Sequence, residues 1–162
     1  MGSGKTTIAQ NLALKTRIPF FDLDTLIEKK EQKTVDKIFK TKGELYFRKQ
    51  EHLILKNFIE NTPEYILSLG GGTPCYAANA AVFEEPNVVS FYLKATPKTL
   101  ANRLKFEIKK RPLLQQIKEE EVEEFIAKHL FERNQFYRKA TYTLAVDAKN
   151  IDEIVEEIKK YL

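Results

Sequence analysis

The chain opens with the stretch Gly2-Ser3-Gly4-Lys5-Thr6-Thr7, which leads directly into an amphipathic segment carrying Ile8 and Leu12. This stretch is the second half of a phosphate-binding loop. Its glycines let successive backbone N–H groups turn toward an anion, and the N-terminus of the following helix adds a partial positive charge. The Lys5 ammonium can reach the β- and γ-phosphates, and the Thr6 hydroxyl can coordinate Mg²⁺. A flexible start ahead of a helix is the alternative, but Gly-Lys-Thr at a helix start favours a nucleotide site.

The first part of this loop pattern does not lie within the sequence. The full pattern G-x-x-x-x-G-K-[ST] begins five residues before Gly4, so its first glycine and the strand that delivers the loop would precede Met1. A buried strand of about five apolar residues contributes roughly 7–15 kcal/mol, which rivals the total stability of about 5–15 kcal/mol of a domain. We therefore expect Met1 to be an internal methionine and the natural polypeptide to start upstream. In-frame upstream codons for an apolar run would support this expectation, and an in-frame stop directly before Met1 would rule it out.

Length and composition indicate one water-soluble domain over residues 1–162. The 162 residues suit a single core, and 43% hydrophobic residues can fill it. Charged residues make up 31% of the chain, and the mean hydropathy is -0.42. No apolar run approaches the roughly 18–20 residues that a bilayer requires, and no secretion signal opens the chain. We therefore expect a cytoplasmic protein that does not bind membranes.

The numbers of cysteine and histidine residues and the distribution of charge argue against three other kinds of protein. Cys75 is the single cysteine and there are two histidines, so neither a disulfide framework nor a zinc site is expected. The net charge of +4 suits nucleic acid or a small phosphorylated or carboxylated ligand equally well. Because the basic residues are scattered and often paired with acids, we do not expect nucleic-acid binding.

Apolar runs alternate with helical periods, which predicts an α/β layer fold on a parallel sheet. The expected strands are short β-branched or aromatic runs that are apolar on both faces: 18–22, 65–69, 88–93 and 142–146. Helices are expected at 121–137 and 151–162, where apolar side chains recur on one face. Residues 107–124 are dense in Lys, Gln and Glu around an Arg-Pro-Leu-Leu run, so we expect a mobile flap, with a lid at about 107–118.

Two carboxylates follow the first expected strand, at the edge where open α/β sheets bind ligands. Strand alternation predicts that Asp22 and Asp24 lie on one side. One could hold the water shell of Mg²⁺ while the other accepts a hydroxyl proton during phosphoryl transfer. The alternative for Asp24 is a cap on a helix expected at 25–30.

A triple glycine and two arginines are the other candidates. Gly70, Gly71 and Gly72 follow the second expected strand, where they allow close backbone approach to a ligand, although an ordinary turn is the alternative. Arg48 lies in a helix expected to open with the Gly-Glu pair at 43–44, and Arg133 lies on the apolar face of its helix. Each could bind a carboxylate through two hydrogen bonds. For either arginine alone, a surface residue is the commoner outcome.

Together these stretches resemble the shikimate kinase family. The likeness covers nearly the whole chain in order, through GSGKTT, FDLDTLIE, IFKTKGELYFRKQE, SLGGG, RPLL and ERNQFYRKA. It implies a P-loop kinase of the nucleoside-monophosphate-kinase type with a three-layer α/β/α fold, here lacking the first central strand. It also implies a monomer that uses ATP and Mg²⁺ to phosphorylate the 3-hydroxyl of shikimate, on the route to chorismate and aromatic amino acids.

On the nucleotide side, the resemblance implies that residues 2–7 cradle the phosphates of ATP, with Lys5 as the catalytic P-loop lysine. Thr6 is then the Mg²⁺ ligand and Asp22 a carboxylate that holds the metal's water shell. Arg111 resembles the lid arginine that closes over the phosphates, where a cation stabilises the charge on the transferred group. Arg103 is similar to an arginine that stacks near adenine, beside the loop at 146–150.

On the acceptor side, the resemblance implies that Asp24 binds and activates the substrate hydroxyl. Arg48 and Arg133 then clamp the shikimate carboxylate, and residues 70–72 line the same pocket. Phe39 and Phe47 resemble aromatic walls of this site, with core packing an equal alternative. Thr73-Pro74 departs from the family pattern, constrains the turn and touches no side chain with an assigned role.

Other functions remain open from the sequence. A related P-loop kinase acting on gluconate or a nucleotide would share the nucleotide half, although paired arginines beside a triple glycine favour a carboxylated acceptor. A non-catalytic nucleotide-binding remnant is the alternative from another class, because the phosphate loop lacks its first glycine.

Overall fold

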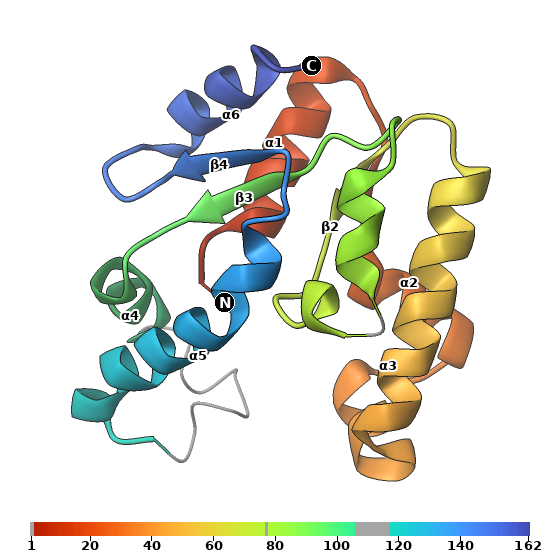
Figure 1. Ribbon diagram of the computed structural model, residues 1–162, viewed down its shortest axis with the longest axis horizontal. Coiled ribbons are helices and arrows are strands. Elements are labelled where there is room, and N and C mark those ends of the chain that lie inside the picture. Colours follow the sequence, from red (N-terminus) through yellow and green to blue (C-terminus); the bar gives the residue numbers. More distant parts are fainter. Residues whose placement is uncertain (1, 77, 106–116) are drawn as a thin grey trace.

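The computed structural model describes residues 2–76, 78–105 and 117–162. Helices and short strands alternate along these residues (Figure 1), as predicted for an α/β fold. The helices are α1 (Lys5–Thr16), α2 (Leu23–Glu31), α3 (Val35–Asn61), α4 (Pro97–Lys105), α5 (Val122–Tyr137) and α6 (Ile151–Lys159). The strands are β1 (Phe20–Asp22), β2 (Ile66–Ser68), β3 (Phe91–Lys94) and β4 (Tyr142–Ala145), and short 3₁₀ turns are η1 (Thr73–Cys75), η2 (Asn79–Glu84) and η5 (Glu119–Glu121).

All four of these strands pair in parallel, but in two separate sheets. β1 pairs with β2, with Asp22 opposite Ser68, and β3 pairs with β4, with Phe91 opposite Tyr142. Within the described residues neither pair hydrogen-bonds to the other. Figure 1 shows β3 and β4 beside α6, whereas β2 lies toward α2 and α3, and α1 contacts β1, β2 and α6.

The strands are less buried than their apolar sequences predict. Of the three residues in β2 only Ser68 is buried, and in β3 only Leu93 is. The physical reason is that β2 and β3 each have a partner on one side only, so their other edges and part of their side chains border a cavity.

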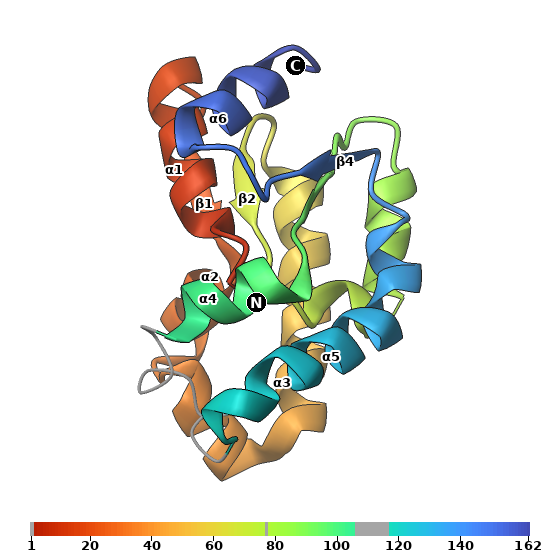
Figure 2. The same cartoon turned by 90° about the vertical axis from the view of Figure 1, so that its left-hand side faces the viewer.

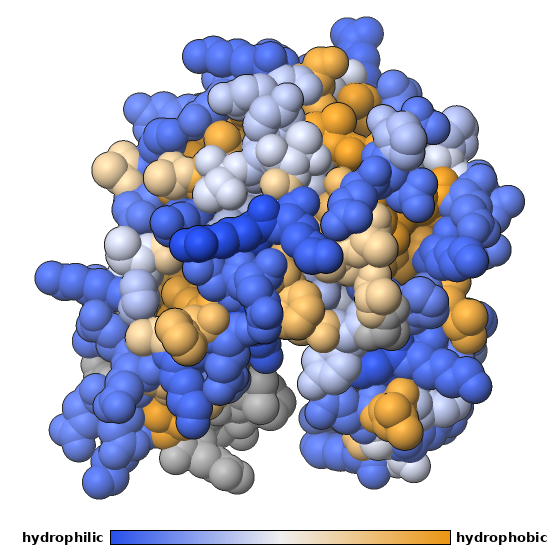
Figure 3. Space-filling model, in the orientation of Figure 1, coloured by the Kyte–Doolittle hydropathy of each residue, from blue (hydrophilic) through white to orange (hydrophobic). Residues whose placement is uncertain are grey.

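Two apolar cores hold the layers together. One joins α1, α4, α5 and α6 to β3 and β4, and the other packs α2 against α3 and β2. In the second core Leu23, Ile27 and Ile38 have no exposed surface. The space-filling view shows a mostly hydrophilic surface with a hollow between the α5 side and the α3 side (Figure 3).

Local signals explain several helix ends. Asn150 and Glu153 form a reciprocal capping box at the start of α6. Gly43 has φ 80° and ψ 169° and interrupts α3, so a second helical segment starts at Glu44, as the Gly-Glu pair predicted. Among the helices of the described residues, none is long and apolar enough to cross a membrane.

Candidate active site

The backbone at residues 2–4 has the form that a phosphate loop requires. Gly2 and Gly4 have φ of 74° and 82°, left-handed values that glycine adopts without strain. A Cβ on Gly2 would also lie 2.9 Å from Cγ of Leu104. α1 begins at Lys5 directly after this turn, so its first N–H groups face the loop. The structure thus brings residues 2–7 to a helix N-terminus, as the sequence predicted.

Thr6 lies where two strands end. Its hydroxyl is 3.4 Å from Oδ2 of Asp22, the last residue of β1, and 3.4 Å from Oγ of Ser68, the last residue of β2. Hydroxyl and carboxylate oxygens are the hard ligands that Mg²⁺ prefers, and this ion usually keeps several waters and substrate phosphates in its shell. The described residues contain no group of three His, Cys, Asp or Glu that could hold a metal. The Thr6 hydroxyl and the Asp22 carboxylate are ligands of this kind, so they fit a Mg²⁺ ion that is shared with a nucleotide.

The two aspartates do not alternate along one strand as predicted. β1 ends at Asp22, whose carboxylate accepts hydrogen bonds from the backbone N–H groups of Asp24 and Thr25 and so caps α2. Asp24 lies in the first turn of that helix, not at its cap. β1 ends at Asp22 as expected, but the Asp22 side chain caps a helix that starts at Leu23, so Asp24 lies on that helix and not on a continued strand. The aspartates still lie close enough to interact through space.

Burial raises the pKa of Asp24 from 3.8 to about 6. The next causes are the negative charges of Asp22, Glu51 and Glu28, while the Arg48 guanidinium acts in the opposite direction. A carboxylate with a pKa near the working pH is suited to accept a proton, because it is largely ionised yet more basic than an ordinary aspartate.

Arg48 is held in place by two carboxylates of its own helix. Its Nη1 donates to Oε2 of Glu51 at 2.9 Å, and its Nε lies 3.3 Å from Oε1 of Glu44. The Arg48 side chain is 15% exposed and Glu51 only 1%, whereas Glu44 is 52% exposed. The guanidinium also lies 4.4 Å from the ring centroid of Tyr76. Arg48 is therefore an anchored, mostly buried guanidinium and not the surface residue that was the alternative.

Phe39 and Phe47 form a tilted pair with ring centroids 4.6 Å apart. Phe47 is 2% exposed and belongs to the core of α2 and α3, and Phe39 packs against that core. The Arg48 guanidinium lies 5.2 Å from the Phe47 centroid and 5.9 Å from that of Phe39. Core packing is thus the main contact of Phe47, and both rings border the guanidinium.

The triple glycine lies between Asp24 and Arg48. A Cβ on Gly70 would lie 3.5 Å from Oδ1 of Asp24, and a Cβ on Gly72 would lie 2.6 Å from Nη2 of Arg48. At the second distance the Arg48 guanidinium would have to move to admit a side chain. Because Gly72 has φ −89°, an unstrained value for other residues, the close approach of Arg48 is what favours glycine there.

Arg133 reaches the same place from α5. It interacts with the hydroxyl of Tyr137, which donates a 2.6 Å hydrogen bond to the carbonyl oxygen of Gly71. Burial raises the pKa of the Cys75 thiol, while the nearby positive charges of Arg133 and Arg48 lower it. Two guanidinium groups thus come close to the glycine loop, Arg48 from α3 and Arg133 from α5.

A buried polar network behind Arg48 was not predicted from the sequence. Thr73 Oγ1 donates a 2.7 Å hydrogen bond to Oε1 of Glu51, and the Thr73 carbonyl accepts from Nδ2 of Asn79 at 2.9 Å. Asn79 Oδ1 lies 2.7 Å from Nδ1 of His52. Thr73 was expected to touch no assigned side chain, yet Glu51 links it to Arg48. The spacing of Arg48 and Glu51 by three helical positions was the available signal.

Arg103 lies beside the loop that follows β4. Its Nη2 donates to the carbonyl oxygen of Val146 at 3.1 Å, and the Asp147 carboxylate accepts from both the N–H and the hydroxyl of Thr96. These contacts place Arg103 near residues 146–150, where the resemblance puts adenine. Arg111 and the expected lid, through residue 116, lie outside the described residues.

Comparisons with known proteins agree with this geometry. A family model described as shikimate kinase matches residues 1–162. A shikimate kinase of Flavobacterium psychrophilum is 50% identical over 162 residues, which cover 100% of this chain and 94% of the relative. One from Flavobacterium johnsoniae is 49% identical over 98% of this chain and 92% of its own length. The chain belongs to the shikimate kinase family.

Solved structures of shikimate kinases share the fold. The enzyme of Bacteroides thetaiotaomicron superposes with a TM-score of 0.90 at 33% identity, over 99% of this chain and 93% of its own. That of Acinetobacter baumannii, solved in complex with shikimate, gives 0.86 at 29% identity, over 99% and 87%. The predicted family, its kinase activity class and its α/β P-loop fold are confirmed. The family match spans residues 1–162 and gives no support to the expectation of a missing first strand.

Proposed function

We propose that this chain transfers the γ-phosphoryl group of ATP to the 3-hydroxyl of shikimate, in the pathway to aromatic amino acids. The observation that carries the proposal is Asp24, a carboxyl whose pKa is raised to about 6, set against Gly70 on the loop beside Arg48. A basic carboxylate, a guanidinium and a glycine loop without side chains thus lie together at the strand ends, near the phosphate loop.

Asp24 is the group that activates the acceptor. Its carboxylate accepts a hydrogen bond from the 3-hydroxyl and takes the proton as the oxygen attacks phosphorus, and the bond from phosphorus to the leaving oxygen of ADP breaks. No covalent enzyme intermediate is needed, because positioning and electrostatic stabilisation supply most of the catalysis.

Arg48 and Arg133 hold the carboxylate of shikimate. Arg48 is oriented by Glu51 and by Glu44, so its guanidinium is preorganised before the acceptor binds. Arg133 approaches from α5 beside Tyr137, and residues 70–72 leave room for the ring between the two. A guanidinium pair favours a carboxylated acceptor over a neutral sugar.

The phosphate loop and Arg103 hold ATP. Residues 2–7 cradle the phosphates, Lys5 reaches the β- and γ-phosphates, and Arg103 borders adenine at the Val146 carbonyl. Mg²⁺ would be held by Thr6, with Asp22 on its water shell, and would neutralise charge between the phosphates. The role of Arg111 in stabilising the transferred group rests on the family resemblance. The monomeric state and the cytoplasmic location stay predictions.

Product analysis tests the proposal. The chain is incubated with ATP, Mg²⁺ and shikimate, and the products are followed by phosphorus NMR. We expect a new phosphomonoester signal that couples to the proton on carbon 3 of the ring. A phosphate on another hydroxyl, or hydrolysis of ATP without a phosphoester, would contradict it.

A further inference from the structure

The loop that follows the triple glycine is held by a buried amide that the proposed kinase chemistry does not use. Asn79 is 1% exposed, and Thr73 has no exposed surface. Nδ2 of Asn79 donates to the carbonyl oxygen of Thr73 at 2.9 Å, and Oδ1 of Asn79 lies 2.7 Å from Nδ1 of His52. A buried amide costs free energy unless its donor and its acceptor are both paired. Both ends of the Asn79 amide are paired, so its orientation is fixed.

This orientation also decides where His52 carries a proton. A backbone carbonyl can only accept, so the NH₂ group of Asn79 must face Thr73 and its oxygen must face His52. The oxygen is an acceptor, so Nδ1 of the half-buried His52 ring is protonated and donates to it. The hydrogen bonds therefore run in one direction, from His52 to Asn79 and from Asn79 to Thr73.

Asn79 fixes both ends of a turn that contacts Arg48, the turn from Thr73 to Tyr76. Its side chain holds the Thr73 carbonyl, and its backbone N–H donates to the carbonyl oxygen of Tyr76 at 2.9 Å. The Thr73 hydroxyl donates to Oε1 of Glu51, whose Oε2 accepts from Arg48. The Tyr76 ring centroid lies 4.4 Å from the Arg48 guanidinium, within the range of a cation–π contact. A shift of this turn would therefore move the guanidinium.

Three polar side chains on one face of α3 meet this turn. They are spaced by three and four residues, which places them side by side on a helix: Arg48, Glu51 and His52. Two of them attach the helix to the turn, Glu51 through Thr73 and His52 through Asn79. The third, Arg48, is thus placed relative to the turn by its neighbours on both sides.

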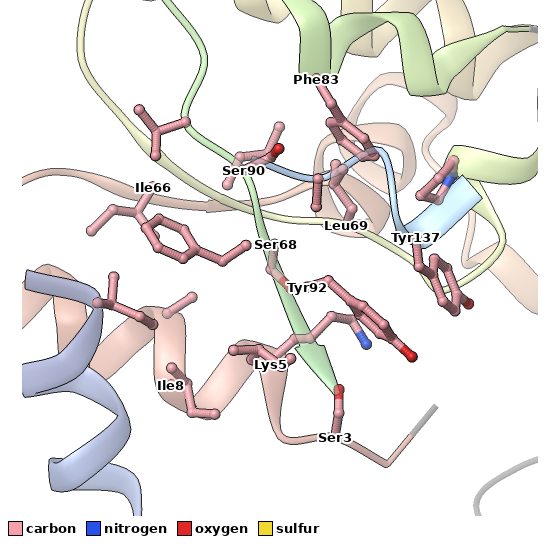
Figure 4. A pocket seen from close by; sticks show the side chains of 18 of the residues that line it. Ser3, Lys5, Ile8, Ile66, Ser68, Leu69, Phe83, Ser90, Tyr92 and Tyr137 are labelled. Carbon is pink, nitrogen blue, oxygen red and sulfur yellow. The ribbon is translucent and has the colours of Figure 1, made fainter. Parts of the chain in front are cut away.

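The glycine loop is held from α5 as well. The Tyr137 hydroxyl donates a 2.6 Å hydrogen bond to the carbonyl oxygen of Gly71. Its ring lies beside Tyr92, with ring centroids 5.0 Å apart (Figure 4). Because this contact fixes the loop at Gly71, the position of its other end, beside Arg48, depends on the hydrogen bonds of Asn79.

We propose that Asn79 and His52 are positioning residues for the carboxylate of the acceptor. They hold the turn from Thr73 to Tyr76 so that the Arg48 guanidinium is aligned before the acceptor binds. The inference rests on the proposed function, in which Arg48 binds the carboxylate of shikimate. Because both residues act through Arg48, their loss should weaken recognition of the carboxylate and leave the ATP side of the site unchanged.

Steady-state kinetics with two acceptors tests this inference. The acceptors are shikimate and its methyl ester, which has the same hydroxyl groups but no carboxylate charge. His52→Leu removes the donor and keeps a side chain of similar reach. We expect KM for shikimate to rise at least about fivefold, with kcat and KM for ATP within about twofold of the wild type. For the ester, kcat/KM should change by less than about twofold, so the preference for the acid should fall.

Rescue by a conservative variant separates positioning from a general structural effect. His52→Asn places an amide nitrogen at the same number of bonds from the backbone as Nδ1, so KM for shikimate should return to within about twofold of the wild type. Asn79→Ala should raise KM for shikimate at least as much as His52→Leu does. Asn61→Ala, at the exposed end of α3, is the matched control and should leave KM unchanged. If Asn79→Ala does not fold, the two His52 variants decide.

The possible outcomes distinguish this inference from the proposed function. An unchanged KM for shikimate in His52→Leu, equal losses with acid and ester, or no rescue by His52→Asn would overturn the inference while the wild type still phosphorylates shikimate. If the ester is turned over too slowly to measure, KM for shikimate in the two His52 variants decides. A wild type that does not phosphorylate shikimate would contradict the proposed function, and the inference with it.

Discussion

Asp24 combines two properties that an isolated aspartate lacks. Burial and the neighbouring Asp22, Glu51 and Glu28 raise its pKa, and Arg48 keeps it from rising further. The first turn of α2 fixes its position, since Asp22 caps that helix. The carboxyl is therefore both basic and immobile, which is what a proton acceptor at a fixed distance from a hydroxyl requires.

Asp24→Asn should abolish turnover and leave ATP binding intact. Loss of the proton acceptor should lower kcat by at least about 100-fold, while the dissociation constant for ATP, measured by calorimetry, should stay unchanged. Asp36→Asn is the matched control, because Asp36 forms an ion pair with Lys40 on the surface of α3. An unchanged kcat in Asp24→Asn would show that Asp24 has no chemical role.

The same substitution should stabilise the fold at neutral pH. Because the pKa of Asp24 is raised on folding, the stability it contributes is present below about pH 3.8 and is lost as the pH rises through about 6. Asparagine removes the desolvated charge, so the free energy of unfolding at pH 7 should rise by up to about 2 kcal/mol. Urea unfolding measures this, and a less stable variant at pH 7 would contradict the assigned burial.

Activity should depend on pH through this one group. Protonated Asp24 cannot accept the hydroxyl proton, so kcat/KM for shikimate should fall as the pH drops through about 6. The residual activity of Asp24→Asn should lack this step. A wild-type profile that stays flat down to about pH 4.5 would contradict the raised pKa.

Glu51→Gln should weaken shikimate binding through Arg48. Glu51 is 1% exposed and accepts from both Arg48 and Thr73, so its charge fixes the guanidinium in a buried setting. We expect KM for shikimate to rise about tenfold with a smaller change in kcat. Glu44→Gln, at the exposed partner of Arg48, should change KM by less than about twofold. Equal changes in KM for the two variants would contradict the claim that Glu51, and not Glu44, holds the Arg48 guanidinium in place.

The loop after β2 carries the acceptor side of the site, and one of its glycines can be tested by a single methyl group. Gly72→Ala places a Cβ 2.6 Å from Nη2 of Arg48, so it should displace the guanidinium and raise KM for shikimate. Gly43→Ala is the control, because Gly43 has φ 80° with nothing within 4 Å of an added Cβ. It should lower stability by about 1 kcal/mol and leave KM unchanged. Steady-state kinetics and urea unfolding separate the two effects.

Elements were easier to predict than their ends. Each predicted strand exists, but β1 covers only the last three residues of its predicted range and β2 only the middle three. The helix at α6 and the break at Gly43 followed from local signals of period and backbone freedom. The placement of Asp24 did not, because Asp22 caps a helix that begins at Leu23, two residues before the expected start at 25.

Side chains that act by positioning another residue could not be predicted from the sequence. Arg48, Arg133 and the triple glycine could be named because their residue types suggest carboxylate binding and close approach. Glu51, Asn79 and Tyr137 could not, since glutamate, asparagine and tyrosine are common, and only the packing of α3, η2 and α5 around the glycine loop brings them together.

The whole molecule divides into two halves that meet at the site. One half holds β1, β2, α2 and α3 and supplies Asp24 and Arg48, and the other holds β3, β4, α4, α5 and α6 and supplies Arg103 and Arg133 (Figures 1 and 2). α1 touches both halves and carries the phosphate loop at its start. The hollow between the α3 and α5 sides (Figure 3) is therefore the expected meeting place of nucleotide and acceptor.

The most direct test of this arrangement is a coupled assay of ADP release with shikimate, quinate and gluconate as acceptors. The two anchored guanidinium groups and the basic carboxyl predict release that requires Mg²⁺, is fastest with shikimate and falls at least about tenfold with either other acid. Faster release with gluconate, or a rate that no acceptor changes, would contradict a shikimate kinase site built from Asp24, Arg48 and Arg133.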